Sequence, residues 1–247
     1  MSNLFIAIVS CHNNKKKQQA IRDTWLTNCP VPYSFFIGQP LDAESVGDVH
    51  SLDVPDNDLY LCRKVHAMWQ YISAKYDYVF KVDDDCYVVM DRLLNPDRYL
   101  NHDYIGWYKA FPSANSHYIH GSSIWFSRKA IEIIASSNEL LRDDRAEDVF
   151  TAKALEGHVL FEHDYRYPPY AGPFPSSYPI QDGWTVDGPI WRQIKDQFVP
   201  GTESTFWEVA PENDLVSAHH LTPEDMYRIH KKFIQTVEQT GTMGRDI

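Results

Sequence analysis

The chain has 247 residues, of which 43% are hydrophobic and 14% aromatic, so it can bury a sizeable core and is not a disordered chain. Its formal net charge of −11 excludes a general electrostatic nucleic-acid binder, because such proteins need a basic face. No apolar run approaches the roughly 20 residues needed to span a bilayer, and the first residues reverse the charge order of a signal peptide.

The first half of the sequence alternates strands with helices. Short β-rich apolar runs predict strands over residues 4–10, 31–38, 51–56 and 76–82. Asn13 or Asn14 can cap a helix that runs to about Leu26, and helical spacing of apolar residues predicts another over 61–76. This alternation predicts an α/β protein with an open, mostly parallel sheet flanked by helices. Ligands of such sheets bind beyond the carboxyl ends of the strands.

The second half is less regular. Strands are expected over 102–108 and 120–127, and helices over 128–137 and 146–157. A last helix is expected to begin with Thr222 as its N-cap and Pro223 in its first position. Residues 163–205 are dense in Tyr, Pro, Gly and Trp, and we expect them to form an ordered but irregular subdomain.

Three consecutive aspartates, Asp83, Asp84 and Asp85, follow the strand predicted over 76–82. Carboxylates this close raise one another's pKa unless a cation neutralises them. A hard divalent metal ion is the natural partner, because Mg²⁺ and Mn²⁺ prefer oxygen ligands. An acidic turn between two strands is the alternative interpretation. A second charged run, Lys15 to Lys17, is interpreted as a solvated helix face, although lysines at a helix start also suit a nearby anion.

Five motifs then occur in a characteristic order. They are IRDTW at 21–25, DNDLYLCRK at 56–64, KVDDDCYVV at 81–89, HGSSIWFS at 120–127 with AEDVF at 146–150, and SAHHLTPEDM at 217–226. In order and spacing they resemble glycosyltransferase family 31, the β-1,3-galactosyltransferase/fringe type, over nearly the whole chain. The resemblance implies one GT-A domain over 1–247, with a nucleotide-sugar-binding half (1–100) and an acceptor and catalytic half (101–247).

The same resemblance implies a metal-dependent, inverting transfer from a UDP-sugar to a glycan acceptor, with a β-1,3 linkage as the expected product. Galactose is the expected sugar, followed by GlcNAc or GalNAc. Mn²⁺ is the expected metal ion, with Mg²⁺ as the alternative. The cysteines match no zinc spacing and there is no N-glycosylation sequon, which favours a cytoplasmic protein. A luminal, Golgi-type domain trimmed of its membrane anchor is the alternative.

The resemblance also implies roles for individual residues. Asp85 and His219 are the implied metal ligands, and Asp83 and Asp84 would hold the donor ribose and the water shell of the metal. His220 is not expected to face the same way as His219 on an extended segment.

The general base is expected in AEDVF. The resemblance implies that Asp148 takes the proton of the acceptor hydroxyl. Its predicted place at the start of a helix is expected to lower its pKa, because the positive end of the helix dipole stabilises the ionised form. Glu147 is the alternative base or a supporting partner. Gly121 would allow the backbone to approach the substrate closely.

Asp56, Lys64 and Arg22 are expected to bind the donor, and the two cations are expected to face its diphosphate. For Arg22, an arginine–carboxylate pair that pins the first helix is a serious alternative. The stretch around Lys64 departs from the family pattern, because Tyr60, Cys62 and Val65 replace the usual Asn, Thr and Thr. This weakens any inference about contacts to the base or ribose.

Aromatic residues could stack on acceptor sugars, although most aromatics lie in protein cores. The candidates are Trp107, Tyr167, Tyr170, Trp184 and Trp191. Two other functions stay open: a metal-dependent phosphohydrolase that uses the aspartates to activate water, and a non-catalytic sugar-binding relative of the same fold. A binder would have no need for the aspartates, the acidic pair and His219 together.

Overall fold

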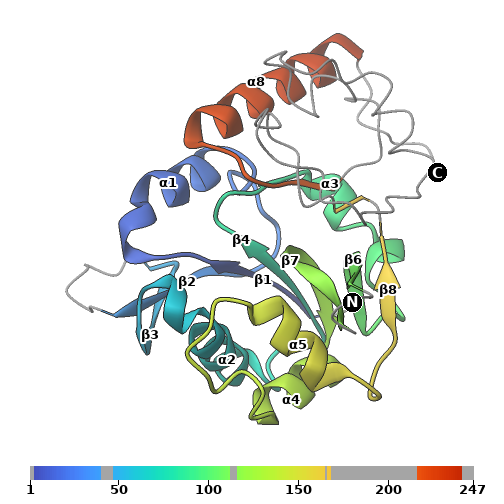
Figure 1. Ribbon diagram of the computed structural model, residues 1–247. Helices are drawn as coiled ribbons and strands as arrows, with labels where there is room; N and C mark the ends of the chain where they lie inside the picture. The colour runs from blue at the N-terminus through green and yellow to red at the C-terminus, as the bar shows by residue number, and fades with distance from the viewer. Residues whose placement is uncertain (1–2, 40–46, 112–115, 165, 168–215, 241–247) are drawn as a thin grey trace.

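The computed structural model describes residues 3–39, 47–111, 116–164, 166–167 and 216–240. Its main sheet has seven strands in the order β3-β2-β1-β4-β7-β6-β8 (Figure 1). The strands are β1 (Leu4–Val9), β2 (Tyr33–Gln39), β3 (Val49–Pro55), β4 (Tyr78–Asp83), β6 (Tyr104–Phe111), β7 (Ser116–Ser127) and β8 (Phe161–His163). The first four are parallel, β7 runs antiparallel to both β4 and β6, and β8 is parallel to β6. The predicted open, mostly parallel α/β sheet is confirmed.

Helices cover both faces of this sheet (Figure 1). On one face lie α1 (Lys15–Asp23) and α8 (Pro223–Thr240), which are joined by a hydrogen bond of 2.7 Å from Tyr227 Oη to Asp23 Oδ2. On the other face lie α2 (Leu61–Ile72), α4 (Arg128–Ser136) and α5 (Glu147–Leu155). The short pieces are α3 (Met90–Leu93), η1 (His12–Asn14), η2 (Asp58–Tyr60) and η3 (Pro96–Arg98). Among the described helices, none combines the length and the apolar character needed to cross a bilayer.

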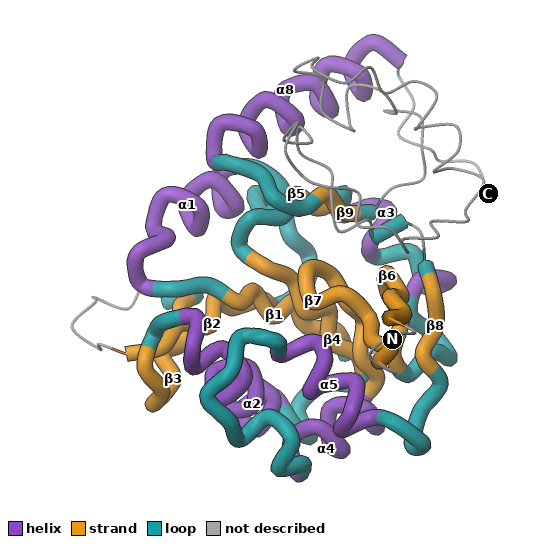
Figure 2. Tube along the Cα trace, viewed as in Figure 1, coloured by secondary structure: helices purple, strands orange, loops and turns teal. Residues whose placement is uncertain are grey.

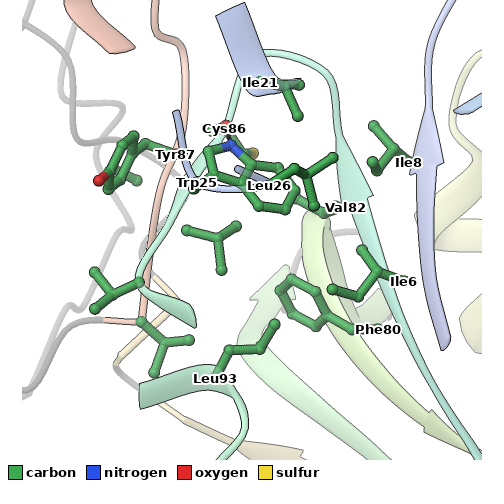
Figure 3. Close-up of a cluster of buried hydrophobic side chains, with 14 of the residues drawn as sticks. Ile6, Ile8, Ile21, Trp25, Leu26, Phe80, Val82, Cys86, Tyr87 and Leu93 are labelled. Atoms are coloured by element: carbon green, nitrogen blue, oxygen red, sulfur yellow. Dashed lines mark hydrogen bonds between the residues drawn. The ribbon is translucent and has the colours of Figure 1, made fainter. Parts of the chain in front are cut away.

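The core follows from the two-residue alternation of the central strands. Ile6 and Ile8 of β1 face α1, together with Phe80 and Val82 of β4, as Figure 3 shows. The intervening residues of β1, such as Ala7, face the layer of α2, α4 and α5 instead. Both faces of β1 are therefore buried, as expected for a strand inside a largely parallel sheet.

A second, two-stranded sheet was not predicted from the sequence. It pairs β5 (Tyr87–Val88), which begins two residues after Asp85, with β9 (Ser217–Ala218), which ends directly before His219. Figure 2 shows this pair lying between the main sheet and α8. Trp25 also contacts the residue between the aspartates and β5, because its Nε1 donates a 3.0 Å hydrogen bond to the carbonyl of Cys86.

Several predicted boundaries differ from the structure. The helix predicted over 61–76 ends at Ile72, and Ala74 follows with φ of 65°, a backbone conformation that cannot continue a right-handed helix. The first helix ends at Asp23 and not at Leu26. Of the irregular subdomain predicted over 163–205, nearly all lies outside the described residues.

Candidate functional site

The aspartates lie at the carboxyl end of the parallel strands. The pairing of β1 with β4 ends at Val9 and Asp83, and the amide of Asp84 donates to the carbonyl of Val9 over 3.1 Å. The end of β1, with Ser10 and the start of α1 beyond it, therefore lies beside the acidic cluster. This is the edge of the sheet where the topology predicts a ligand site.

Asp84 is buried and anchors this edge. Its Oδ2 accepts hydrogen bonds from Ser10 Oγ at 2.6 Å and from Asn14 Nδ2 at 2.8 Å, and its Oδ1 lies 3.3 Å from Lys17 Nζ. Burial raises its pKa, although these partners oppose the shift. Asn14 therefore binds Asp84 and does not cap α1 with its side chain. The interpretation of Lys17 as solvated helix surface is wrong, because its ammonium contacts Asp84 and lies 3.6 Å from Asp85 Oδ2.

Asp85 and His219 are brought together by the β5–β9 pair. Besides that pairing, the amide of Leu221 donates to the Asp85 carbonyl over 2.9 Å. His219 Nε2 lies 3.0 Å from Asp85 Oδ1 and 3.9 Å from Asp83 Oδ2. Burial alone would raise the pKa of Asp85, but His219 and Lys17 lower it to about 2. Asp85 is thus an anion at neutral pH.

His220 lies in the same cluster, which corrects the expectation that it would face elsewhere. Its φ of 63° turns the chain, so that its ring stacks on His219 at 3.8 Å between centroids. Its Nδ1 is 3.9 Å from Asp85 Oδ2. The expectation assumed an extended segment, and a left-handed residue breaks that geometry.

The residues of this cluster fit a divalent metal ion. One ligand atom each from Asp85, His219 and His220 lies within 4.8 Å of the others. Asp85 Oδ1 is buried and has no hydrogen bond of good geometry among the described residues, which leaves a lone pair for a cation. Imidazole nitrogen with carboxylate oxygen suits Mn²⁺ better than Mg²⁺.

The acidic pair Glu147 and Asp148 begins α5 and packs against Gly121 of β7. Asp148 Oδ2 accepts from the amide of Gly121 at 3.2 Å, and its Oδ1 accepts from the amide of Val149 at 2.9 Å. The expected lowering of the Asp148 pKa is wrong in direction, because burial raises this pKa more than Lys81 and the two amides lower it.

Glu147 is fully enclosed. Burial, opposed in part by Lys81, raises its pKa to about 7. Its Oε1 lies 2.7 Å from Lys81 Nζ. Lys81 is itself buried, and its ammonium also donates to Asp83 Oδ1 at 2.8 Å and to the carbonyl of Gly121. Burial would lower the pKa of Lys81, but Asp83 and Glu147 raise it, so the side chain stays charged. The sequence interpretation overlooked Lys81, although a lysine inside an apolar strand, two positions before Asp83, is an unusual residue that could have been noticed.

Lys64 and Asp56 form a buried pair at the same edge of the sheet. Lys64 Nζ donates to Asp56 Oδ1 at 3.0 Å and to the carbonyl of Ser10 at 2.7 Å. The other oxygen of Asp56 accepts from the amide of His12. The pair ties α2 and the end of β3 to the loop after β1. The structure thus places both residues beside the candidate site, with Lys64 already engaged by protein acceptors.

Arg22 lies elsewhere. Its Nε and Nη2 each donate a 2.8 Å hydrogen bond to Asp48, and its guanidinium lies 4.6 Å from the Phe35 ring centroid. Asp48 precedes β3, so this pair lies toward the amino ends of the parallel strands, opposite the aspartates. The geometry is that of the alternative interpretation, a pair that pins the first helix, and we no longer expect Arg22 to face the donor.

The aromatic candidates divide in three. Tyr167 is fully buried and packs 5.9 Å from the Phe80 ring, so the expectation that it stacks on a sugar is wrong. Trp107 is half-buried, and its ring meets His163 edge-on at 5.1 Å. Tyr170, Trp184 and Trp191 lie outside the described residues.

Comparison with known proteins gives the fold. No protein-family model matches the sequence, and no curated protein matches it. The structure of an active-site mutant of LgtC matches with a TM-score of 0.50 and 9% sequence identity, over 92% of this chain and 95% of LgtC. A glycosyltransferase involved in glycosylating the major capsid of PBCV-1 matches with a TM-score of 0.49 and 12% identity, over 92% and 98% of the two chains. The galactosyltransferase LgtC in complex with donor and acceptor sugar analogs matches with a TM-score of 0.47 and 10% identity, over 98% of each chain.

The chain has the GT-A-type α/β fold. This rests on the seven-stranded sheet and on the match to the LgtC mutant. At 9% identity that match establishes the fold and not the reaction. Membership of glycosyltransferase family 31 stays a prediction from the sequence motifs.

Proposed function

We propose that the chain is a metal-dependent, inverting glycosyltransferase that moves a sugar from a UDP-sugar to a glycan acceptor. Galactose is the proposed sugar and a β-1,3 bond the proposed linkage, both on the family 31 resemblance alone. One observation carries the proposal. Lys81 links two chemically different groups: it donates to Asp83, whose Oδ2 lies 3.9 Å from His219 of the metal cluster, and to Glu147 of the acidic pair.

The reaction needs one carboxylate that can reach the acceptor. Asp148 is our proposed base, because Glu147 is buried and its Oε1 is engaged by Lys81, whereas Asp148 is only half-buried. The raised pKa of Asp148 makes it a stronger proton acceptor than a free aspartate. Asp148 takes the acceptor hydroxyl proton while that oxygen bonds to the anomeric carbon. The bond from this carbon to the phosphate oxygen breaks, and UDP leaves with the electron pair from the opposite face, which inverts the configuration.

Positive charge is required beside the departing diphosphate. A divalent ion held by Asp85 and His219 would supply it when bound. From the chain itself, Lys17 stands at the start of α1 beside Asp84 and Asp85, and Lys64 lies at the same edge behind Ser10. We propose that Lys17 and Lys64 add to this positive charge, while Asp83 and Asp84 shape the donor side of the site.

A donor screen tests the proposal. UDP-galactose, UDP-GlcNAc and UDP-GalNAc are each incubated with Mn²⁺, and UDP release is measured with and without candidate acceptor glycans. We expect one donor to release UDP faster when an acceptor is present, with a β-linked product in NMR spectra. Release of inorganic phosphate without transfer would establish the phosphohydrolase alternative. Donor binding without turnover would establish the non-catalytic one.

A further inference from the structure

Lys81 is the first residue of the KVDDDCYVV motif, but the motif assigns it no role and the proposed reaction gives it no step. Its side chain comes from the middle of the sheet and is 1% exposed. The ammonium has three acceptors on three separate elements: Asp83 Oδ1 of β4, the Gly121 carbonyl of β7 and Glu147 Oε1 of α5. A lysine has three donor hydrogens, so these acceptors use all of them.

This contact also fixes how α5 begins. Ala146, the N-cap residue, offers no side-chain hydrogen bond to the helix. A Cβ on Gly121 would lie 2.5 Å from Glu147 Oε1, so any larger residue at this position would push the Glu147 carboxylate away from its present place. Asp148 follows Glu147 directly and accepts the Gly121 amide. The orientation of Asp148 therefore depends on the same small set of contacts.

The three contacts of Lys81 connect a buried carboxylate with one that is partly exposed to solvent. Asp83, at one end, has a side chain that is 31% exposed, while Glu147, at the other end, is 8% exposed. A single buried ammonium thus holds a carboxylate on the donor side and the carboxylate that precedes the proposed base. A buried ion network of this kind contributes little net stability, because desolvation offsets the attraction, but it specifies geometry when every partner is satisfied.

We propose that Lys81 is a positioning residue for sugar transfer, which couples Asp83 to Glu147 and thereby sets the distance between the donor and Asp148. This inference rests on the proposed function and adds to it a residue that does not itself touch the substrate. Misplacing a catalytic group by about 1 Å can cost on the order of 100-fold in rate. Removal of Lys81 should therefore reduce kcat much more than it changes the KM for the donor.

The first test needs no activity. Hydrogen exchange of residues 147–151 is compared in the wild type, Lys81→Met and Lys64→Met. Lys64 is a matched control, because it is also a buried lysine that binds one carboxylate and one carbonyl at the same edge of the sheet. We expect exchange at the start of α5 to rise at least tenfold in Lys81→Met and to stay unchanged in Lys64→Met. Unchanged exchange in a folded Lys81→Met protein would overturn the inference.

The second test is a double-mutant cycle. Lys81→Met and Glu147→Ala should each lower kcat by about 100-fold, and the double variant should be no worse than either, because both remove the same contact. Glu147→Gln keeps an acceptor oxygen for Lys81 and should retain most of the rate. Multiplicative losses in the double variant, or a Glu147→Gln variant as inactive as Glu147→Ala, would contradict the positioning role.

Gly121→Ala gives an independent route if Lys81→Met does not fold. The added methyl group displaces Glu147 Oε1 without changing any charge. We expect kcat to fall with little change in donor KM, together with faster exchange at 147–151. Wild-type kinetics and exchange in Gly121→Ala would overturn the inference. If the wild-type protein transfers no sugar at all, the proposed function fails, and the exchange experiment still decides whether Lys81 holds the start of α5.

Discussion

His219 Nε2 lies 3.0 Å from Asp85 Oδ1, although β4 and β9 are separated by more than half of the chain. The β5–β9 pair brings them together, because Tyr87 pairs with Ala218, so that Asp85, two residues before Tyr87, and His219, next after Ala218, lie at the same end of the ladder. The His219 side chain is 7% exposed and the His220 side chain is 51% exposed. We therefore expect His219 to be the more important ligand of the two.

The metal site is tested by removing its ligands. Asp85→Asn and His219→Ala should each abolish most activity and weaken Mn²⁺-dependent UDP binding at least tenfold, because loss of one ligand opens the site. His220→Ala should have a smaller effect, since its ring is more exposed and lies farther from Asp85. Calorimetric titration of UDP with and without Mn²⁺ measures the binding in each variant, and UDP release in the presence of an acceptor measures the activity. Activity that survives EDTA would contradict the metal dependence. A larger loss in His220→Ala than in His219→Ala would show that His220 is the more important ligand.

The acidic pair is tested by separating binding from chemistry. Asp148→Asn keeps the shape of the side chain but cannot take a proton, so kcat should fall by roughly 10²–10⁴-fold while donor affinity stays nearly unchanged. Steady-state kinetics and donor titration check this. If Glu147→Gln abolishes turnover and Asp148→Asn does not, the base is Glu147. If neither affects transfer, the acidic pair has a structural role only.

The buried carboxyl of Glu147 predicts a pH dependence of stability. Its pKa is about 7 in the folded chain and 4.5 as its ordinary value, so the folded state holds the proton more tightly. This contribution to stability is full below pH 4.5 and is lost as the pH rises toward 7. Relative to the wild type, Glu147→Gln should therefore gain stability over that range, by at most on the order of 3 kcal/mol. Urea unfolding between pH 4.5 and 7.5 measures it, and parallel curves for the two proteins would contradict it.

For Arg22 we predict an effect on the stability of the fold and none on donor binding. Arg22→Met should lower the free energy of unfolding by about 1–3 kcal/mol, because it leaves the partly buried Asp48 without its charged partner. Donor affinity should not change, since the pair lies away from the aspartates. The matched variant Asp48→Asn should show coupling with Arg22→Met in a stability cycle. A loss of UDP affinity in Arg22→Met would restore the diphosphate role that the motif implied.

Particular residues show how far the sequence alone leads. The continuous apolar run through Ile6, Ala7 and Ile8 is enough to predict a buried strand, because side chains in a strand point to opposite sides and here both sides are apolar. The position of Asp83 to Asp85 after such a strand predicts their place at the carboxyl edge, since parallel strands end together. Both features depend on residues close together in the sequence, and the structure confirms both predictions.

The tertiary structure decided the features that depend on partners distant in sequence. Arg22 looks the same in the sequence whether it faces a diphosphate or Asp48, and only the register of β2 with β3 places Asp48 beside it. His220 joins His219 because one residue adopts a left-handed backbone, which no periodicity indicates. Lys81 has its acceptors because β7 and α5 bring the Gly121 carbonyl and the Glu147 carboxylate to it. A motif fixes which side chains are present, but the direction of a charged side chain is set by which counter-charge the fold places within reach.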